Sequence, residues 1–326
     1  MNIGVDFQLL DSRLSGSAEY YDKVVDDLLY LINVPVPPNL FPQTWDNIGE
    51  LQSSGVEVSL NYSIIQDNDL NWSVAGTYSW MSPQVLQEFV SEDTQFISNA
   101  GSPGLNATPL IKVEEGEPIG EIFGKRFAEI SPDGNWLFFD QDGNKVTADE
   151  ITLDDQEVLG NGLPDHQIGF TNNISYKNWD MTLFFQGVFG HQLVNTFRLF
   201  YETPNQISSY NVLDTAFDWV NRGSENRTLR ESPQFSDVYV ENGDFVKLQN
   251  VTIGYTIPVS RLENIRRLRV SASINNAFTI TNYKGINPEP RYVDSSNGDD
   301  PLAPGIERRN EWFTSRTFTL GLNFDF

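Results

Sequence analysis

The 326-residue sequence contains no cysteine, which excludes disulfides and metal sites built on thiolates. It also has no run of about 18 consecutive apolar residues, the length that marks a candidate transmembrane helix. Basic residues are scarce: 21 Lys and Arg stand against 45 Asp and Glu, for a net charge of -24. Nucleic acid is therefore excluded from the predicted partners, because phosphate binding needs clustered Lys and Arg.

A secretory signal peptide is missing as well. The residues after Met1 alternate at once like a strand, with Ile3, Val5 and Phe7 on one face. Since an exported protein needs such a signal, we expect the chain to be the C-terminal part of a longer protein.

The last stretch, residues 315–326, alternates between apolar and polar side chains up to the final residue. Its apolar face carries Phe318, Leu320, Leu322, Phe324 and Phe326. A membrane β-barrel requires this pattern, because one strand face contacts lipid and the other a polar lumen. A soluble protein rarely leaves such a strand at its end, since an unpaired apolar edge promotes aggregation. We predict that Leu322, Phe324 and Phe326 form a barrel assembly signal.

The same alternation predicts nine strands, and their connections differ by position. The strands cover residues 2–10, 14–20, 54–66, 70–80, 166–177, 179–190, 244–257, 267–279 and 315–326. A phase change near Gln249 and Asn250 predicts a β-bulge in the seventh. Connections after odd-numbered strands are short and those after even-numbered strands are long, so antiparallel order places all long ones on one side. This asymmetry is typical of outer-membrane barrels, with short periplasmic turns and long extracellular loops.

Two long connections carry further signals. Region 82–165 is predicted to be an irregular extracellular loop, and its 17 acidic against 4 basic residues give it a net charge of -13. Within it, 135–143 reads as a hairpin closed by an Asp-Gly turn. In 191–243, Tyr210, Leu213, Phe217 and Val220 have helical spacing, which predicts one short amphipathic helix.

Nine strands cannot close on themselves without an exposed edge, and bacterial single-chain barrels have even strand numbers. Plugged outer-membrane transporters have about 22 strands. The predicted fold is therefore all-β: a partial antiparallel transmembrane barrel that spans 1–326 and supplies the last two-fifths of a larger plugged barrel.

Several short motifs, in order along essentially the whole chain, point to one family. They are Asn47-Ile48-Gly49 with Gly55-Val56-Glu57, Gly116-Glu117-Pro118-Ile119-Gly120 with Phe123-Gly124, Gly160-Asn161-Gly162-Leu163-Pro164 with Gly169-Phe170-Thr171-Asn172, Tyr176-Lys177-Asn178-Trp179-Asp180, Phe245-Val246-Lys247-Leu248-Gln249-Asn250-Val251 with Gly254-Tyr255, and Asn275-Asn276-Ala277-Phe278 with Tyr283-Lys284-Gly285 and Pro288-Glu289. Together they resemble the SusC/RagA family of TonB-linked outer-membrane receptors.

This resemblance implies an outer-membrane barrel that imports glycan or peptide fragments. It implies two partners: a SusD-like surface lipoprotein acting as a lid, which the acidic loops would contact, and the TonB complex, which supplies energy. The family's plug domain and TonB box lie upstream of the matched region, so they are expected to be absent from this chain. The resemblance implies no catalytic residues.

Candidate chemistry is sparse. His166 and His191 lie near opposite ends of neighbouring predicted strands and lack cysteine partners, which favours ordinary polar roles over a metal site. A calcium site remains an alternative for an acidic run that lacks EF-hand spacing: Asp140, Asp142, Asp149, Glu150, Asp154 and Asp155. No cofactor is predicted. The carboxylates of 82–165 are numerous, but number alone does not make a glycosidase pair.

Five tryptophans have candidate roles. Trp136 and Trp219 are the substrate-binding candidates, as exposed loop aromatics on which sugar rings could stack; alternatively, they pack the long loops together. Trp80, Trp179 and Trp312 lie near predicted strand ends and fit the aromatic girdles of a barrel.

A secreted soluble β-sandwich that binds or cleaves carbohydrate is the alternative from another class. It predicts that the apolar face of Phe318, Leu320 and Leu322 is covered by a second sheet, whereas a barrel predicts an exposed apolar band about 25 Å tall. A simple pore without TonB coupling is a third possibility.

Overall fold

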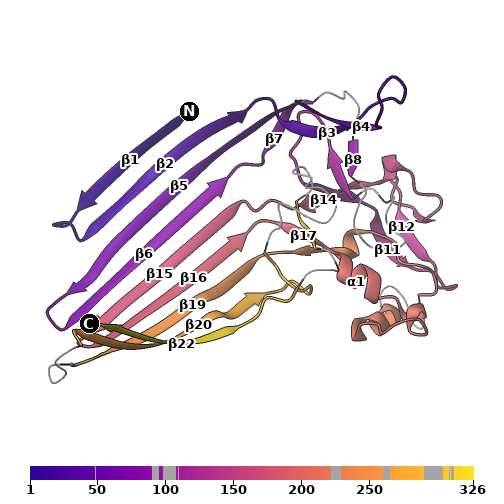
Figure 1. Ribbon diagram of the computed structural model, residues 1–326. Coiled ribbons are helices and arrows are strands. Elements are labelled where there is room, and N and C mark those ends of the chain that lie inside the picture. The colour runs from indigo at the N-terminus through magenta and orange to yellow at the C-terminus, as the bar shows by residue number, and fades with distance from the viewer. Residues whose placement is uncertain are drawn as a thin grey trace.

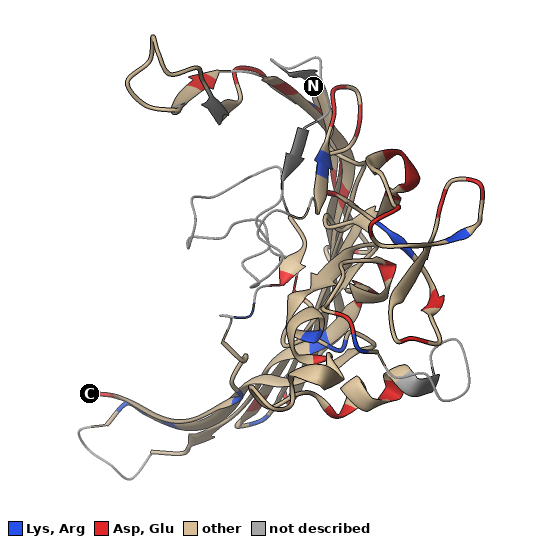
Figure 2. Cartoon of the chain, turned by 90° about the vertical axis from the view of Figure 1, so that its right-hand side faces the viewer, with Lys and Arg blue, Asp and Glu red and all other residues tan. Residues whose placement is uncertain are grey.

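The computed structural model describes residues 1–47, 49–89, 95–97, 108, 110–221, 229–259, 265–289, 304–307, 309 and 312–326. One large antiparallel sheet dominates it, and smaller elements gather at one end of that sheet (Figure 1). Figure 2, seen from that end, shows the sheet as an arc between the two termini. Within the described residues, no helix has the length and apolarity needed to cross a membrane.

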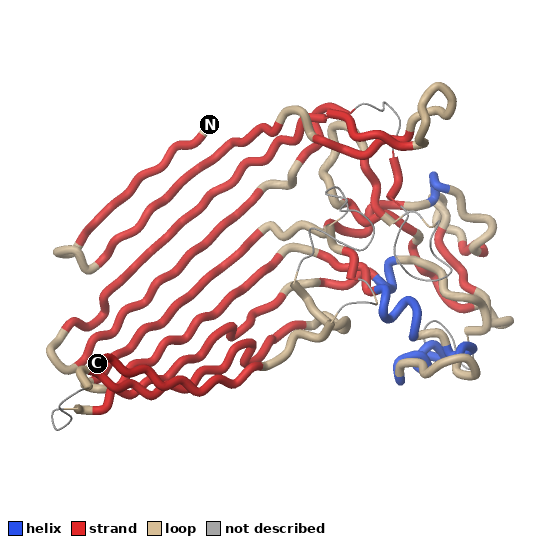
Figure 3. The backbone as a smooth tube through the Cα atoms, in the orientation of Figure 1, coloured by secondary structure: helices blue, strands red, loops and turns tan. Residues whose placement is uncertain are grey.

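The large sheet contains the nine predicted strands in sequence order, which confirms that prediction for the described residues. They are β1 (Asn2–Leu9), β2 (Leu14–Val25), β5 (Gly49–Gln66), β6 (Leu70–Met81), β15 (His166–Tyr176), β16 (Trp179–Phe189), β19 (Phe245–Ile257), β20 (Arg267–Thr281) and β22 (Thr317–Asp325). A short tenth strand, β7 (Val85–Phe89), pairs with the loop-side end of β5. The short turns lie at one end and the long connections at the other (Figure 3).

The predicted bulge is confirmed. The register of β19 shifts between Leu248 and Asn250 against β20, and the β16–β19 register shifts between Phe184 and Phe185. Against β16, Gln249 is an extra residue in β19, whereas against β20 the extra residue lies in β20. The side chains on either side of Gln249 keep their faces although the alternation in sequence changes phase.

The apolar face of β22 is uncovered. Phe318 is 71% exposed, Leu320 86% and Leu322 61%. The sandwich alternative, which requires a second sheet over these three residues, is therefore wrong. Apolar side chains on the same face of the other strands of the large sheet are also exposed, among them Leu60, Tyr78, Ile168, Phe170, Tyr176, Trp179, Ile253 and Val270.

Where the structure describes them, the long connections form small sheets, so the prediction of an irregular loop for 82–165 is wrong. They contribute β8 (Gln95–Ile97), β9 (Ile111–Val113), β10 (Glu121–Gly124) and β14 (Glu157–Asn161) to one small sheet, β11 (Arg126–Ile130), β12 (Trp136–Phe139) and β13 (Lys145–Thr147) to a second, and β17 (Gln192–Asn195), β18 (Val240–Asn242) and β21 (Ile306–Glu307) to a third. The hairpin predicted in 135–143 is confirmed by β12 and β13. A separate hairpin joins β3 (Leu29–Asn33) to β4 (Gln43–Asn47).

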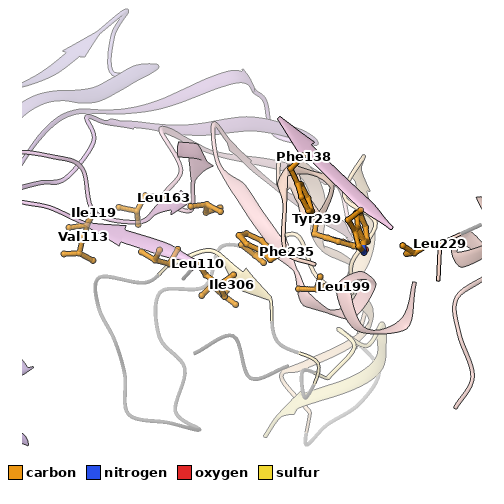
Figure 4. Close-up of a cluster of buried hydrophobic side chains, with 14 of the residues drawn as sticks. Leu110, Val113, Ile119, Phe138, Leu163, Leu199, Leu229, Phe235, Tyr239 and Ile306 are labelled. Atoms are coloured by element: carbon orange, nitrogen blue, oxygen red, sulfur yellow. The ribbon is translucent and has the colours of Figure 1, made fainter. Parts of the chain in front are cut away.

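We call the described residues of 82–165, 190–244 and 304–307 the loop cap. They share one buried apolar cluster, part of which is drawn in Figure 4. Its members include Leu110, Ile122, Trp136, Phe138, Leu199, Trp219, Phe235, Tyr239 and Ile306. The cap is folded because three segments far apart in sequence bury apolar surface against each other, which no single segment could do alone.

Helical structure in the cap differs from the prediction. Among the described residues, the α-helix α1 (Thr196–Tyr201) lies upstream of the predicted one. The short 3-10 helix η1 (Leu153–Asp155) precedes it, and η2 (Pro204–Gln206), η3 (Asp214–Asn221) and η4 (Asp237–Tyr239) follow it. In η3, Ala216 and Trp219 are buried while Phe217 is exposed. Residues three apart share a face in a 3-10 helix, so the apolar spacing in the sequence selected the wrong face.

Candidate functional site

The face of the large sheet opposite the exposed apolar side chains is polar, and we call it the inner face. One cross-strand row illustrates it: Ser17 lies opposite Ser59, Ser59 opposite Thr77, Thr77 opposite Gly169 and Gly169 opposite Gln186. The Oγ atoms of Ser17 and Ser59 are 2.8 Å apart. Strict alternation along each strand, with a period of two residues, places these polar groups on one side.

A hollow in the inner face, which we call the wall groove, crosses β2, β5, β6, β15 and β16. Its polar lining consists of Ser17, Glu19, Glu57, Ser59, Thr77, Ser79, Gln167 and Gln186. A Cβ atom at Gly169 would lie 2.5 Å from Thr77 Oγ1 and 3.6 Å from Phe184 Cε2. The absent side chain therefore lets a hydroxyl and an aromatic ring approach the same spot on the wall.

Two pairs of opposite charge lie elsewhere on the inner face. Arg269 Nε donates to Asp180 Oδ1 at 3.0 Å, and a second hydrogen bond makes the pair bidentate. Lys247, which is buried, donates to Glu289 Oε1 at 2.6 Å. Glu19 and Glu57 differ: they are direct cross-strand neighbours, and neither forms an ion pair with a described residue.

The segment 283–289 is fastened to the loop cap by buried carboxylates. Glu307, 1% exposed, accepts hydrogen bonds of 2.7 Å from the backbone N–H groups of Ile286 and Asn287 and from the Tyr283 hydroxyl. Glu241 accepts another from the Lys284 N–H at 2.8 Å. These contacts hold the segment against the third small sheet.

His191, which follows β16 in the chain, also contacts segment 283–289. Its Nε2 lies 3.0 Å from the Pro288 carbonyl oxygen, and the ring packs against Gly243, where no side chain intervenes. Burial lowers the pKa of His191, so the ring is neutral at pH 7. Nε2 carries the hydrogen, because a carbonyl oxygen can only accept.

A buried ion cluster connects α1 to β18. Arg198 donates to Glu202 Oε2 at 2.6 Å, and also to Glu241 and the Val238 carbonyl oxygen. Burial alone would lower the pKa of Arg198, but the Glu202 and Glu241 carboxylates outweigh burial and raise it. The guanidinium is therefore charged, and its counter-charges are supplied by two different elements.

The candidate tryptophans are buried, so their prediction as exposed loop aromatics is wrong. Trp136 is 0% and Trp219 1% exposed, and their rings meet edge to face at 4.7 Å. Trp136 Nε1 donates to the Ser232 carbonyl oxygen and Trp219 Nε1 to that of Glu202. With both indole nitrogens satisfied inside the protein, full burial is favourable, as the packing alternative predicted.

The two histidines lie at the same end of the sheet, not at opposite ends, because antiparallel pairing sets His166 opposite Phe189. They have separate partners: His166 Nδ1 lies 3.0 Å from the Tyr78 hydroxyl, whereas His191 faces Pro288. The arrangement brings the histidines to one end without directing them at a common point.

Carboxylates of the acidic run accept hydrogen bonds from residues that are close in sequence. Asp140 accepts from Asn144, Glu150 from Thr147, and Asp155 from Thr152; these bonds lower the pKa values of the three carboxyl groups. Among the described residues, no group of three or more His, Asp or Glu converges as a metal site would. Calcium binding by this run stays an alternative.

Comparison with known proteins identifies the architecture. Residues 1–277 match the family model described as TonB dependent receptor-like, beta-barrel. The chain belongs to the TonB-dependent receptor family. It is 31% identical over 351 residues to TonB-dependent receptor P3 of Formosa agariphila, and 25% identical over 335 residues to TonB-dependent receptor SusC of Bacteroides thetaiotaomicron. Both alignments cover 100% of this chain, but 34% and 31% of the relatives.

The receptor chain thus spans about a third of the length of the curated relatives it matches. Its fold is similar to that of the RagAB peptide transporter, with a TM-score of 0.79, 24% identity, and coverage of 98% of this chain and 34% of that chain. The predicted SusC/RagA resemblance, partial barrel fold and outer-membrane location are confirmed. The assembly role of Leu322, Phe324 and Phe326 stays a prediction.

A charge on the exposed face of β22 is expected to destabilise the receptor. Leu320→Arg should cost about 2–4 kcal/mol, because that face contacts lipid near the middle of the strand. Thr319→Arg, one residue away on the inner face, is the matched control and should cost far less. Denaturant unfolding of the receptor in phospholipid vesicles measures both. Equal losses would contradict the assignment of the two faces.

Proposed function

We propose that this barrel segment is part of the wall of a TonB-dependent importer of polar nutrient oligomers, either glycan or peptide fragments. The observation that carries the proposal is the continuous polar inner face, set behind an exposed apolar outer face, in a chain of this receptor family. Hydroxyl and amide side chains suit cargo rich in hydrogen-bonding groups.

Both glycans and peptides remain candidates for the cargo. RagAB is a peptide importer, but an identity below 25% supports the shared fold and not a shared substrate. The wall groove offers hydroxyls, amides, carboxylates and one aromatic edge, which serve either class. No catalytic step is proposed.

The partners of the importer are also proposals. The loop cap lies at the end of the sheet where extracellular loops are expected, and its buried core makes it a firm platform for a SusD-like surface lipoprotein. Coupling to the TonB complex would run through parts of the receptor family that lie outside the matched region.

Uptake by cells tests the proposal. Fluorescent pools of neutral glucan oligosaccharides and of uncharged peptides are offered to cells with and without the receptor, and to cells with the receptor but without TonB. We expect accumulation of one pool only when receptor and TonB are both present. Uptake that persists without TonB would instead support a simple pore, and no receptor-dependent uptake would refute the proposal.

A further inference from the structure

The wall groove contains a pair of like charges at its β2–β5 boundary. Glu19 and Glu57 are in direct cross-strand register, and both line the groove. Glu19 also lies across β1: a Cβ at Gly4 would be 2.8 Å from Glu19 Cγ, so a larger residue there would displace the Glu19 side chain. Tyr21 lies in the same way over Gly55, on the loop side of the pair.

This pairing is unfavourable for the sheet. Like charges directly opposite one another in an antiparallel pair destabilise it. Elsewhere on the inner face, Asp180 is paired with Arg269 and Lys247 with Glu289. Glu19 and Glu57 instead give the groove a local negative potential that no described residue neutralises through an ion pair.

The remaining lining of the groove points to a ligand rather than to a counter-ion. Hydroxyls and amides surround the pair, and the edge of Phe184 lies beside the open backbone of Gly169. Such a surface binds neutral polar molecules by hydrogen bonds and by contact with a ring. An anionic group placed there would gain the same contacts but would meet two carboxylates at close range.

We infer that Glu19 and Glu57 form a charge filter that makes the importer discriminate against anionic oligomers. This inference rests on the proposed function, and it deepens that function by naming neutral oligomers as the preferred cargo over uronates, sulfated sugars or acidic peptides. Two like unit charges about 4 Å apart in water repel each other by about 1 kcal/mol, which weakens the binding of an anionic oligomer about fivefold. Low-dielectric walls focus the field and increase it.

The test compares the neutral pool that the receptor imports with the same pool carrying one added carboxylate per molecule. In cells with the Glu19→Gln/Glu57→Gln receptor, the ratio of carboxylated to neutral uptake should rise about five- to twentyfold over wild type. The difference should shrink at high ionic strength, because exposed charges are then screened.

A second double variant provides the control. Asp67→Asn/Asp69→Asn removes two charges from the exposed turn between β5 and β6, outside the groove, and should leave the ratio at the wild-type value. Heat-modifiable gel mobility verifies that all barrels are folded. If both variants raise the ratio equally, overall charge and not the pair is responsible, and the inference is overturned.

The two proposals fail in different ways. An unchanged ratio in Glu19→Gln/Glu57→Gln, with normal receptor-dependent uptake of the neutral pool, refutes the charge filter and leaves the importer standing. This is also the result expected if a part of the receptor outside this chain covers the groove. If wild-type cells import neither pool, both proposals fall together.

Discussion

Replacing Arg198 by methionine is expected to destabilise the loop cap by about 3–5 kcal/mol, because the substitution removes the guanidinium from a buried ion cluster. Glu202 is fully buried and Glu241 nearly so, and both carboxylates form ion pairs with the Arg198 guanidinium. Methionine fills a similar volume, so the loss reports charge and hydrogen bonding more than a cavity.

Native-state hydrogen exchange of the receptor measures this effect. Amides of β17, α1 and β18 should exchange faster, while those of β15 and β16 keep their protection. Arg126→Met is the matched control: Arg126 lies 3.8 Å from Glu157, with both side chains about half exposed. A surface pair of this kind contributes about 0–1 kcal/mol. Similar exchange in both variants would show that the buried cluster does not hold the cap.

The consequence of a loosened cap extends to segment 283–289. Glu241 bridges Arg198 and the Lys284 N–H, so the ion cluster and the fastening of that segment share one carboxylate. Loss of Arg198 should therefore also accelerate exchange at Lys284. Glu307 holds the neighbouring amides of Ile286 and Asn287 independently, and these should respond less.

The barrel wall was predictable because its determinants are local. In β22, the alternation of Phe318, Leu320 and Leu322 with polar residues predicts both the strand and which of its two faces is apolar. Lipid and lumen impose that pattern strand by strand, so each can be recognised without its neighbours. Even the bulge at Gln249 is visible as a change of phase within one strand.

The loop cap was not predictable in the same way, since its determinants are distant in sequence. Glu307 serves amides about twenty positions upstream, and Arg198 meets Glu241 across forty-three positions. The charge of 82–165 suggested a solvated loop, although apolar residues such as Ile122 and Phe138 are fully buried there. The short apolar runs in this region are a signal of the core. The run 136–139 predicts a hairpin strand, but the sequence alone does not show what that strand packs against.

The Glu19–Glu57 pair is only partly predictable from the sequence. Each glutamate is visible in the sequence as a polar residue on the lumen side of its strand, but their opposition depends on the register between β2 and β5. A slip of one residue would move every side chain of a strand to the other face. Only the folded sheet therefore identifies which carboxylates confront each other.

Trp136→Ala is expected to cost about 3–5 kcal/mol of cap stability, since a fully buried indole is removed from a packed core. Trp136 packs against Phe127, Phe138, Trp219 and Tyr239, and its Nε1 donates to Ser232. The expected result is rapid exchange and proteolysis within β11–β13 and η3, with heat-modifiable mobility of the barrel unchanged.

Trp136→Phe separates the packing role from a ligand-stacking role. Phenylalanine keeps an aromatic face but loses the Ser232 hydrogen bond and part of the volume, so cap protection should fall by an intermediate amount. If Trp136 were instead a stacking platform for cargo, Trp136→Ala would reduce uptake while the cap stayed protected. Since the ring is enclosed by four aromatic neighbours, we expect cap protection to fall first and any loss of uptake to follow from it.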